Sequence, residues 1–145
     1  MKIGGFNMVT EDYVSFETAK LLKEKGFDAD IDLWYNSDGE IFHLYHYDYN
    51  AIKYFACVQC PTLQMATKWI QKTFNIVIIP NYEYECDDTP WCYKIFMLKE
   101  NGKPERIAIR GVIVCYRDYE RSYKDYFTKE EAIEDGIKYC LENLI

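Results

Sequence analysis

The sequence lacks the short motifs that mark the common enzyme classes. It contains no GxGxxG, no complete P-loop, no GxSxG, no HExxH and no EF-hand loop. It has only two histidines, His43 and His46, and neither lies near a recognisable nucleophile. No pair of catalytic residues can be named from the sequence, which therefore favours a non-enzymatic protein.

Long runs of basic or apolar residues are also missing. No run of Lys and Arg exceeds two residues and the net charge is −7, so the chain should repel the phosphate backbone of nucleic acids. No stretch approaches the roughly 20 apolar residues that span a bilayer, and residues 1–7 do not resemble a signal peptide. We expect a cytoplasmic protein without nucleic-acid or membrane partners, whose six cysteines are reduced thiols.

What remains is the composition of an ordinary globular domain. The 145 residues suit a single domain that spans the whole chain, 1–145, and that needs no metal or disulfide to be stable. An apolar content of 49% argues against disorder. No low-complexity segment or linker divides the chain.

Three helices are predicted. The first covers residues 16–25, with Ser15 as its N-cap and Gly26 in the left-handed position after its end. The second opens at residue 61 or 62 and runs to 74, with apolar residues at helical spacing. The third begins at Thr128, which forms a capping box with Glu131. Its apolar stripe continues to the chain end, and four charged residues are expected to face away from that stripe: Lys129, Glu130, Glu134 and Asp135.

Strand signals lie between the helices. Residues 33–35 and 41–45 flank a turn at 36–39, and a buried central strand at 76–79 should stop at Pro80. Residues 91–99 and 105–116 form a second hairpin, in which Ile95 falls opposite Ile107. Together these elements predict an α+β domain with a mainly antiparallel sheet of about five strands and three helices, in the order α-β-β-α-β-β-β-α.

Four residues raise the possibility of a metal site: His43, His46, Cys57 and Cys60. Structural zinc takes Cys and His pairs at short spacing. However, His43 and His46 stand three positions apart on a predicted strand and would point to opposite faces. We expect no metal or other cofactor, and two ordinary histidines.

Cys57 and Cys60 also permit a thiol-redox interpretation. With Pro61 at the first helical position, Cys60 would become the N-cap, where free N–H groups lower a thiol pKa. The preceding residues show no clear strand-to-helix switch, and cysteine commonly packs as a small hydrophobe. The sequence favours inert packing for these two cysteines, and also for Cys115 and Cys140 on apolar patterns.

Tyrosine is abundant, with fourteen residues. Tyr116, Tyr119, Tyr123 and Tyr126 recur at helical spacing and are expected to form one stripe on a short helix. Tyrosines concentrate at interfaces because they add contact area with a polar tip at low entropic cost. Four that lie in turn-rich, charge-flanked segments are candidates for a protein-partner or self-association surface: Tyr47, Tyr49, Tyr82 and Tyr84. Covering the rim of the core is the alternative role.

Two stretches carry a resemblance: residues 13–27, YVSFETAKLLKEKGF, and residues 61–71, PTLQMATKWIQ. Together with the Thr-capped last helix, they resemble a group of small uncharacterised proteins of gut bacteria and their phages. No activity is assigned to that group. The resemblance covers about a third of the chain and favours an accessory or interaction role over metabolism.

The sequence thus leaves two functions open. The first is a non-enzymatic interaction or accessory domain of the phage or prophage type. The second is a thiol-redox or metal-binding protein that uses Cys57 and Cys60.

Overall fold

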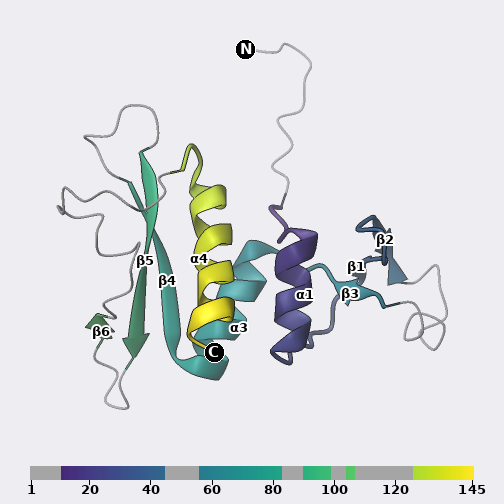
Figure 1. Cartoon of the computed structure of the whole chain (residues 1–145), viewed down its shortest axis with the longest axis horizontal. Coiled ribbons are helices and arrows are strands. Elements are labelled where there is room, and N and C mark those ends of the chain that lie inside the picture. Colours follow the sequence, from purple (N-terminus) through teal and green to yellow (C-terminus); the bar gives the residue numbers. More distant parts are fainter. Residues whose placement is uncertain (1–10, 45–55, 83–89, 99–103, 107–125) are drawn as a thin grey trace, which may run out of the picture.

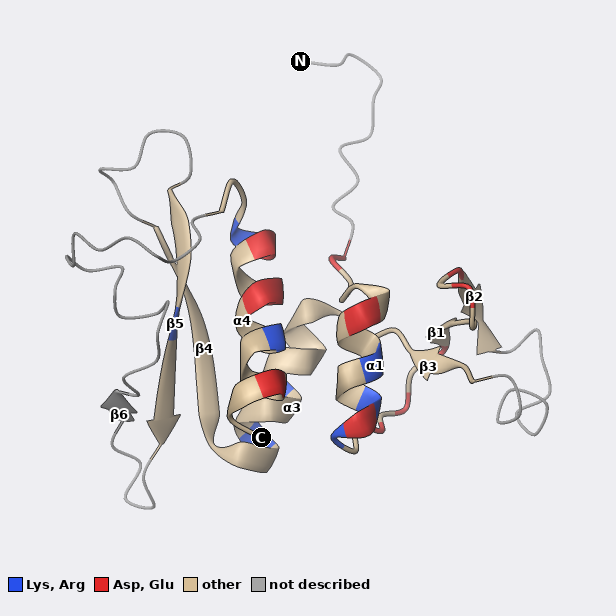
Figure 2. Ribbon diagram, viewed as in Figure 1, with Lys and Arg blue, Asp and Glu red and all other residues tan. Residues whose placement is uncertain are grey.

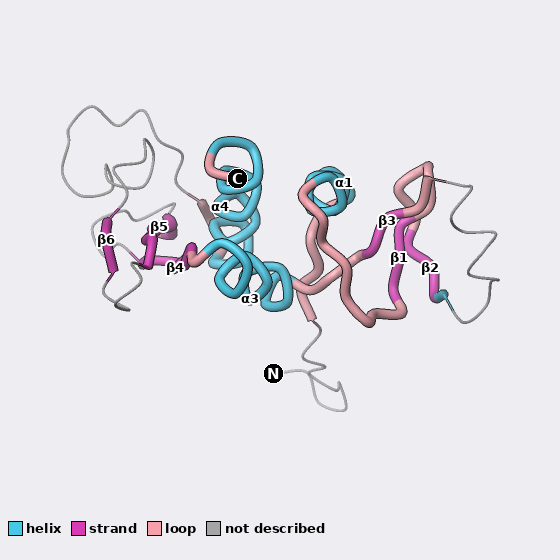
Figure 3. Tube along the Cα trace, turned by 90° about the horizontal axis from the view of Figure 1, so that it is seen from below, coloured by secondary structure: helices cyan, strands magenta, loops and turns pink. Residues whose placement is uncertain are grey.

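The computed structural model describes residues 11–44, 56–82, 90–98, 104–106 and 126–145. In chain order these residues form α1 (Phe16–Glu24), β1 (Leu33–Tyr35), β2 (Ile41–His43), β3 (Val58–Gln59), α3 (Leu63–Phe74), β4 (Ile76–Tyr82), β5 (Trp91–Leu98), β6 (Pro104–Arg106) and α4 (Lys129–Asn143). The helices lie between two antiparallel sheets, a first sheet of order β2-β1-β3 and a second of order β4-β5-β6 (Figures 1 and 3). The predicted α+β class is confirmed, although the strands form two sheets and β3 adds one that was not predicted.

The helix ends follow from local sequence. The Ser15 hydroxyl accepts a hydrogen bond from the Thr18 N–H and caps α1. At the other end Gly26 has a φ of +91°, and the N–H groups of Gly26 and Phe27 bond to the carbonyls of Lys23 and Leu22. This pair of bonds is a Schellman motif, so both predicted ends of α1 are confirmed to within one residue.

The other two helices begin at threonine N-caps. Thr62 accepts from the Met65 N–H, and Thr128 accepts from the Glu131 N–H. Glu131 reaches back as expected of a capping box, but its Oε2 accepts from the N–H of Phe127, one residue before the N-cap. α3 ends at Phe74, and its C-cap Asn75, with a left-handed φ of 57°, turns the chain directly into β4.

β4 differs from its prediction. It continues through Pro80 to Tyr82 and pairs along its whole length with β5, from Ile76↔Met97 to Tyr82↔Trp91. In the sheet that the described residues form, β4 has no neighbour on its other side, so it is an edge strand there and not the central strand that was predicted. An edge position explains Pro80, because proline is tolerated where no N–H has to join the ladder.

The register of the second hairpin is confirmed. Phe96 pairs with Arg106, Met97 with Glu105 and Leu98 with Pro104, which is the register that would place Ile95 opposite Ile107. Ile107 and the tyrosines at 116, 119 and 123 lie outside the described residues. Tyr126 is buried and forms an isolated bridge with Trp91, so the prediction that it belongs to a helical stripe is wrong.

α4 packs on the second sheet, on α1 and on α3. One side lies on β4 and β5, and another contacts α1 (Figure 1). A Cβ at Gly136 would stand 2.8 Å from Ile78 Cγ2 and 3.2 Å from Tyr93 Cγ, so only glycine lets the helix approach the sheet this closely. This contact buries Ile78, Ile95 and Ile137, which belong to one core cluster that also includes buried residues of α1, α3 and the first sheet.

Candidate functional site

Cys57 and Cys60 flank β3 in the first sheet and are buried, with 6% and 1% of their surface exposed. The Cys60 N–H donates to the Leu33 carbonyl, so this residue is held in extended backbone. The helix begins two residues later, at Thr62, because Val14 and Tyr13 pair with Pro61 and Thr62. The expectation that Cys60 is a helix N-cap is therefore wrong.

The surroundings of both thiols oppose ionisation. Burial raises the pKa of Cys57, with Lys23 acting in the opposite direction. Burial also raises the pKa of Cys60, where the hydrogen bond with Tyr35 lowers it and the Glu134 carboxylate raises it again. Reactive cysteines require the reverse, an electropositive and partly exposed setting. The geometry around these two residues is that of a packed core.

His43 and the two cysteines lie at opposite edges of the first sheet. His43 is on β2, whereas Cys57 and Cys60 flank β3, and β1 lies between the two strands. Its half-exposed ring places Nδ1 3.1 Å from Asp32 Oδ2. His46 lies outside the described residues. Within the described ranges, no three His, Cys, Asp or Glu side chains are grouped so that they could hold a metal ion.

Of the four tyrosines predicted to form a partner surface, Tyr82 lies within the described residues. Tyr82 is 58% exposed, and its ring stands edge-on to Trp91 at 5.2 Å between centroids. Phe127, next to the bridge residue Tyr126, is 69% exposed. Tyr47, Tyr49 and Tyr84 lie outside the described residues. The described part of the chain thus places exposed aromatic surface at the end of the second sheet where β4 stops and β5 starts.

A cavity of about 390 Å³ is lined by Pro80 and Lys129, which stand two positions from Tyr82 and Phe127 in the sequence, and we call it the α3–α4 groove. Its apolar walls come from three elements: Leu63 of α3, Ile78 and Pro80 of β4, and Ile133 of α4. Its charged residues are Glu11, Asp12, Lys129 and Glu130. Tyr82 is two positions beyond Pro80 and so lies on the same face of the strand, although it is not one of the residues that line the groove.

The start of the described chain helps to build the groove. The Leu63 N–H donates to the Asp12 carbonyl at 2.8 Å, and Val14 N–H donates to the Pro61 carbonyl at 3.0 Å. These bonds hold residues 12–14 against the start of α3. The groove was not predicted, because its residues come from four separate segments and share no sequence motif.

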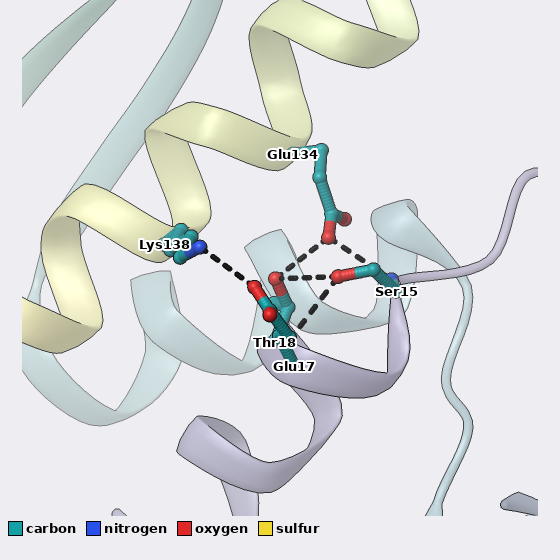
Figure 4. Close-up of polar contacts among 5 residues, drawn as sticks. All are labelled: Ser15, Glu17, Thr18, Glu134 and Lys138. Atoms are coloured by element: carbon teal, nitrogen blue, oxygen red, sulfur yellow. Dashed lines mark hydrogen bonds and ion pairs between the residues drawn. The ribbon is translucent and has the colours of Figure 1, made fainter. Parts of the chain in front are cut away.

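A second polar arrangement joins α1 to α4 (Figure 4). Glu134 Oε1 accepts hydrogen bonds from the Ser15 N–H at 2.9 Å and from Thr18 Oγ1 at 2.6 Å. Lys138 donates to Glu17 at 3.0 Å on the same helix pair. The expectation that Glu134 faces away from the core is wrong, because α1 covers this side of α4. These contacts fix the two helices relative to each other.

Comparisons of the chain with known protein families, with curated proteins and with solved structures found no match. Among the described helices, none is both long enough and apolar enough to span a membrane.

Proposed function

We propose that this chain is a non-enzymatic protein-interaction domain, an accessory protein of the phage or prophage type that acts in the cytoplasm. One observation carries the proposal: the exposed ring of Tyr82, which packs edge-on against the partly buried Trp91, lies two positions beyond Pro80 in the wall of the α3–α4 groove. Large aromatic side chains next to a concavity are typical of the residues that dominate binding energy at protein interfaces. A partner surface there would gain about 25 cal/mol for each Å² of apolar area it buries.

The alternative function, thiol-redox chemistry or metal binding through Cys57 and Cys60, has less support. Both side chains are buried, and burial raises both pKa values. Either activity requires thiolates that a substrate or ion can reach. The alternative would therefore need the first sheet to open, whereas the Tyr82 ring is already exposed.

The test is capture of binding partners by the full chain and by two variants. Tyr82→Ser removes the exposed ring of the pair. Ile41→Ser is the matched control, because Ile41 is 50% exposed on the first sheet at the opposite end of the molecule. The proposal expects that any protein retained by the wild type is lost with Tyr82→Ser and kept with Ile41→Ser. Equal retention by all three chains would refute a role for the aromatic pair.

A further inference from the structure

The outer edge of β4 can be assigned from two hydrogen-bonded contacts. The Leu98 N–H donates to the Asn75 carbonyl at 2.8 Å, in the same register as the β4–β5 ladder. Bonded pairs alternate in antiparallel strands, so Val77, Ile79 and Asn81 direct their backbone groups to β5. On the far side of β5, Trp91 exchanges two hydrogen bonds with Tyr126, as this alternation requires. The backbone groups of Ile78, Pro80 and Tyr82 therefore point away from β5.

Pro80 occupies one of these outward positions. It has no N–H to offer there, so β4 keeps its full ladder with β5 while the outer edge retains the carbonyl groups of Ile78, Pro80 and Tyr82 and the N–H groups of Ile78 and Tyr82. Unpaired strand edges act as templates for an added strand. The α3–α4 groove lies against Ile78 and Pro80 of this same strand.

The charge of the groove indicates what kind of partner it suits. Glu11, Asp12 and Glu130 carry three negative charges against the one positive charge of Lys129, and the whole chain has a net charge of −7. Acidic residues also predominate on α4 (Figure 2). A cationic partner would be attracted, and a second copy of this chain would be repelled.

The starts of α3 and α4 do not make the groove an anion site. Thr62 and Thr128 already cap the two helices, each by accepting an N–H from the first turn. The three carboxylates beside them would repel an anion. A ligand that donates hydrogen bonds and carries positive charge fits both the carbonyl edge and the acidic rim.

We propose that the α3–α4 groove binds an extended basic peptide segment of a partner protein. The segment adds to the outer edge of β4 from Ile78 to Tyr82. Its alternate side chains lie on Pro80 and on the Tyr82–Trp91 pair, and its Lys or Arg side chains reach Asp12 and Glu130. This inference rests on the proposed interaction function and names the partner class of that site.

The first experiment is selection of a phage-displayed random heptapeptide library on the full-length chain. Enriched peptides should combine Lys or Arg with alternating apolar residues. Enrichment of acidic or neutral peptides, or no enrichment, would overturn the proposal. The Tyr82→Ser capture result is independent of this outcome, so failure here would leave the broader interaction function standing.

The second experiment measures binding of the most enriched peptide, labelled with a fluorophore, by anisotropy. Asp12→Asn combined with Glu130→Gln should weaken binding about three- to tenfold, and added salt should narrow this difference. Glu142→Gln, an exposed acidic position at the far end of α4, should leave the affinity unchanged. Equal affinities for the double variant and the wild type would contradict the proposed charge recognition.

Backbone pairing needs its own control. Two copies of the peptide would be made, each N-methylated at every second residue, with the methyl groups on odd positions in one copy and on even positions in the other. Only one of the two patterns blocks the N–H groups that face the β4 carbonyls, and that copy should bind at least about tenfold more weakly. Unchanged affinity with both patterns would refute strand addition.

Sedimentation should show a monomer. A dimer that the Asp12 and Glu130 substitutions dissociate would show that a second copy occupies the groove instead.

Discussion

Thr18 Oγ1 donates a hydrogen bond of 2.6 Å to Glu134 Oε1, and this contact joins α1 to α4 across 116 positions of sequence. The same carboxylate oxygen accepts from the Ser15 N–H at the start of α1. A carboxylate in this place also interacts favourably with the positive end of the α1 dipole. The second oxygen, Oε2, is buried and has no hydrogen-bond partner among the described residues, which satisfy Glu134 only in part.

Glu134→Ala should destabilise the protein. The substitution leaves the Ser15 N–H and the buried Thr18 hydroxyl without their acceptor, which costs about 1–3 kcal/mol. Urea denaturation would measure the loss in free energy of unfolding. Glu142→Ala, on an exposed position of the same helix, should stay within about 0.5 kcal/mol of the wild type. Equal stabilities for the two variants would show that the α1–α4 contact contributes nothing.

Gly136→Ala should destabilise through a steric conflict. The new Cβ would stand 2.8 Å from Ile78 Cγ2, and overpacking of this kind costs about 1–3 kcal/mol. Alanine regains about 1 kcal/mol of helix propensity, so the net loss should be up to about 2 kcal/mol. A double-mutant cycle with Ile78→Ala provides the check, since removing Cγ2 should relieve part of the conflict. Additive effects would show that the two residues do not meet as the structure describes.

The helix ends could be predicted from the sequence because their causes are local. Ser15 bonds to an N–H three residues away, and Gly26 closes a motif that spans six residues. The β5–β6 register was equally accessible, since a short connection leaves few ways to align two apolar patterns. In each case residues close together in the sequence determine the structure, so the helix end or the strand register can be predicted from them.

The site could not be predicted in the same way. Glu134 looks like a solvent-facing residue on its own helix, and only the packing of α1 buries it. Cys60 was expected to cap a helix, but pairing between residues 13–14 and 61–62 moves the N-cap to Thr62. The α3–α4 groove joins residues from four segments. The burial of Glu134, the N-cap of α3 and the groove all depend on contacts between residues far apart in the sequence, and no single stretch of sequence contains those contacts.

The ion pair between Glu17 and Lys138 should make stability depend on pH. The hydrogen bond from Lys138 and its positive charge lower the pKa of Glu17 from the ordinary value of 4.5. Because the folded pKa lies below the unfolded one, this stabilisation is complete above pH 4.5 and is lost as pH falls through the folded value. Lys138→Met should therefore lower stability slightly at neutral pH and reduce the loss on acidification.

Urea denaturation at neutral pH and below pH 4.5 would test this prediction. Lys68→Met is the control, because Lys68 is exposed on α3 and lies outside the Glu17–Lys138 pair. The effect of Lys138→Met should also shrink at high salt, since both partners meet solvent. An unchanged pH dependence in the Lys138 variant would assign the acid sensitivity to other carboxylates.

The buried thiols should react slowly in the folded protein. Cys60 and Cys140 are 1% and 0% exposed, and burial raises the pKa of Cys140 to about 12. At that pKa about one thiol in 10⁵ is ionised at neutral pH, against about 3% for an ordinary cysteine. Pulsed iodoacetamide labelling, with each site located by peptide mass spectrometry, should modify both residues far more slowly in the native chain than in urea. Fast native labelling of Cys60, together with a reversible Cys57–Cys60 disulfide in a glutathione series, would instead support the redox alternative, because a catalytic thiol has to reach its substrate as a thiolate.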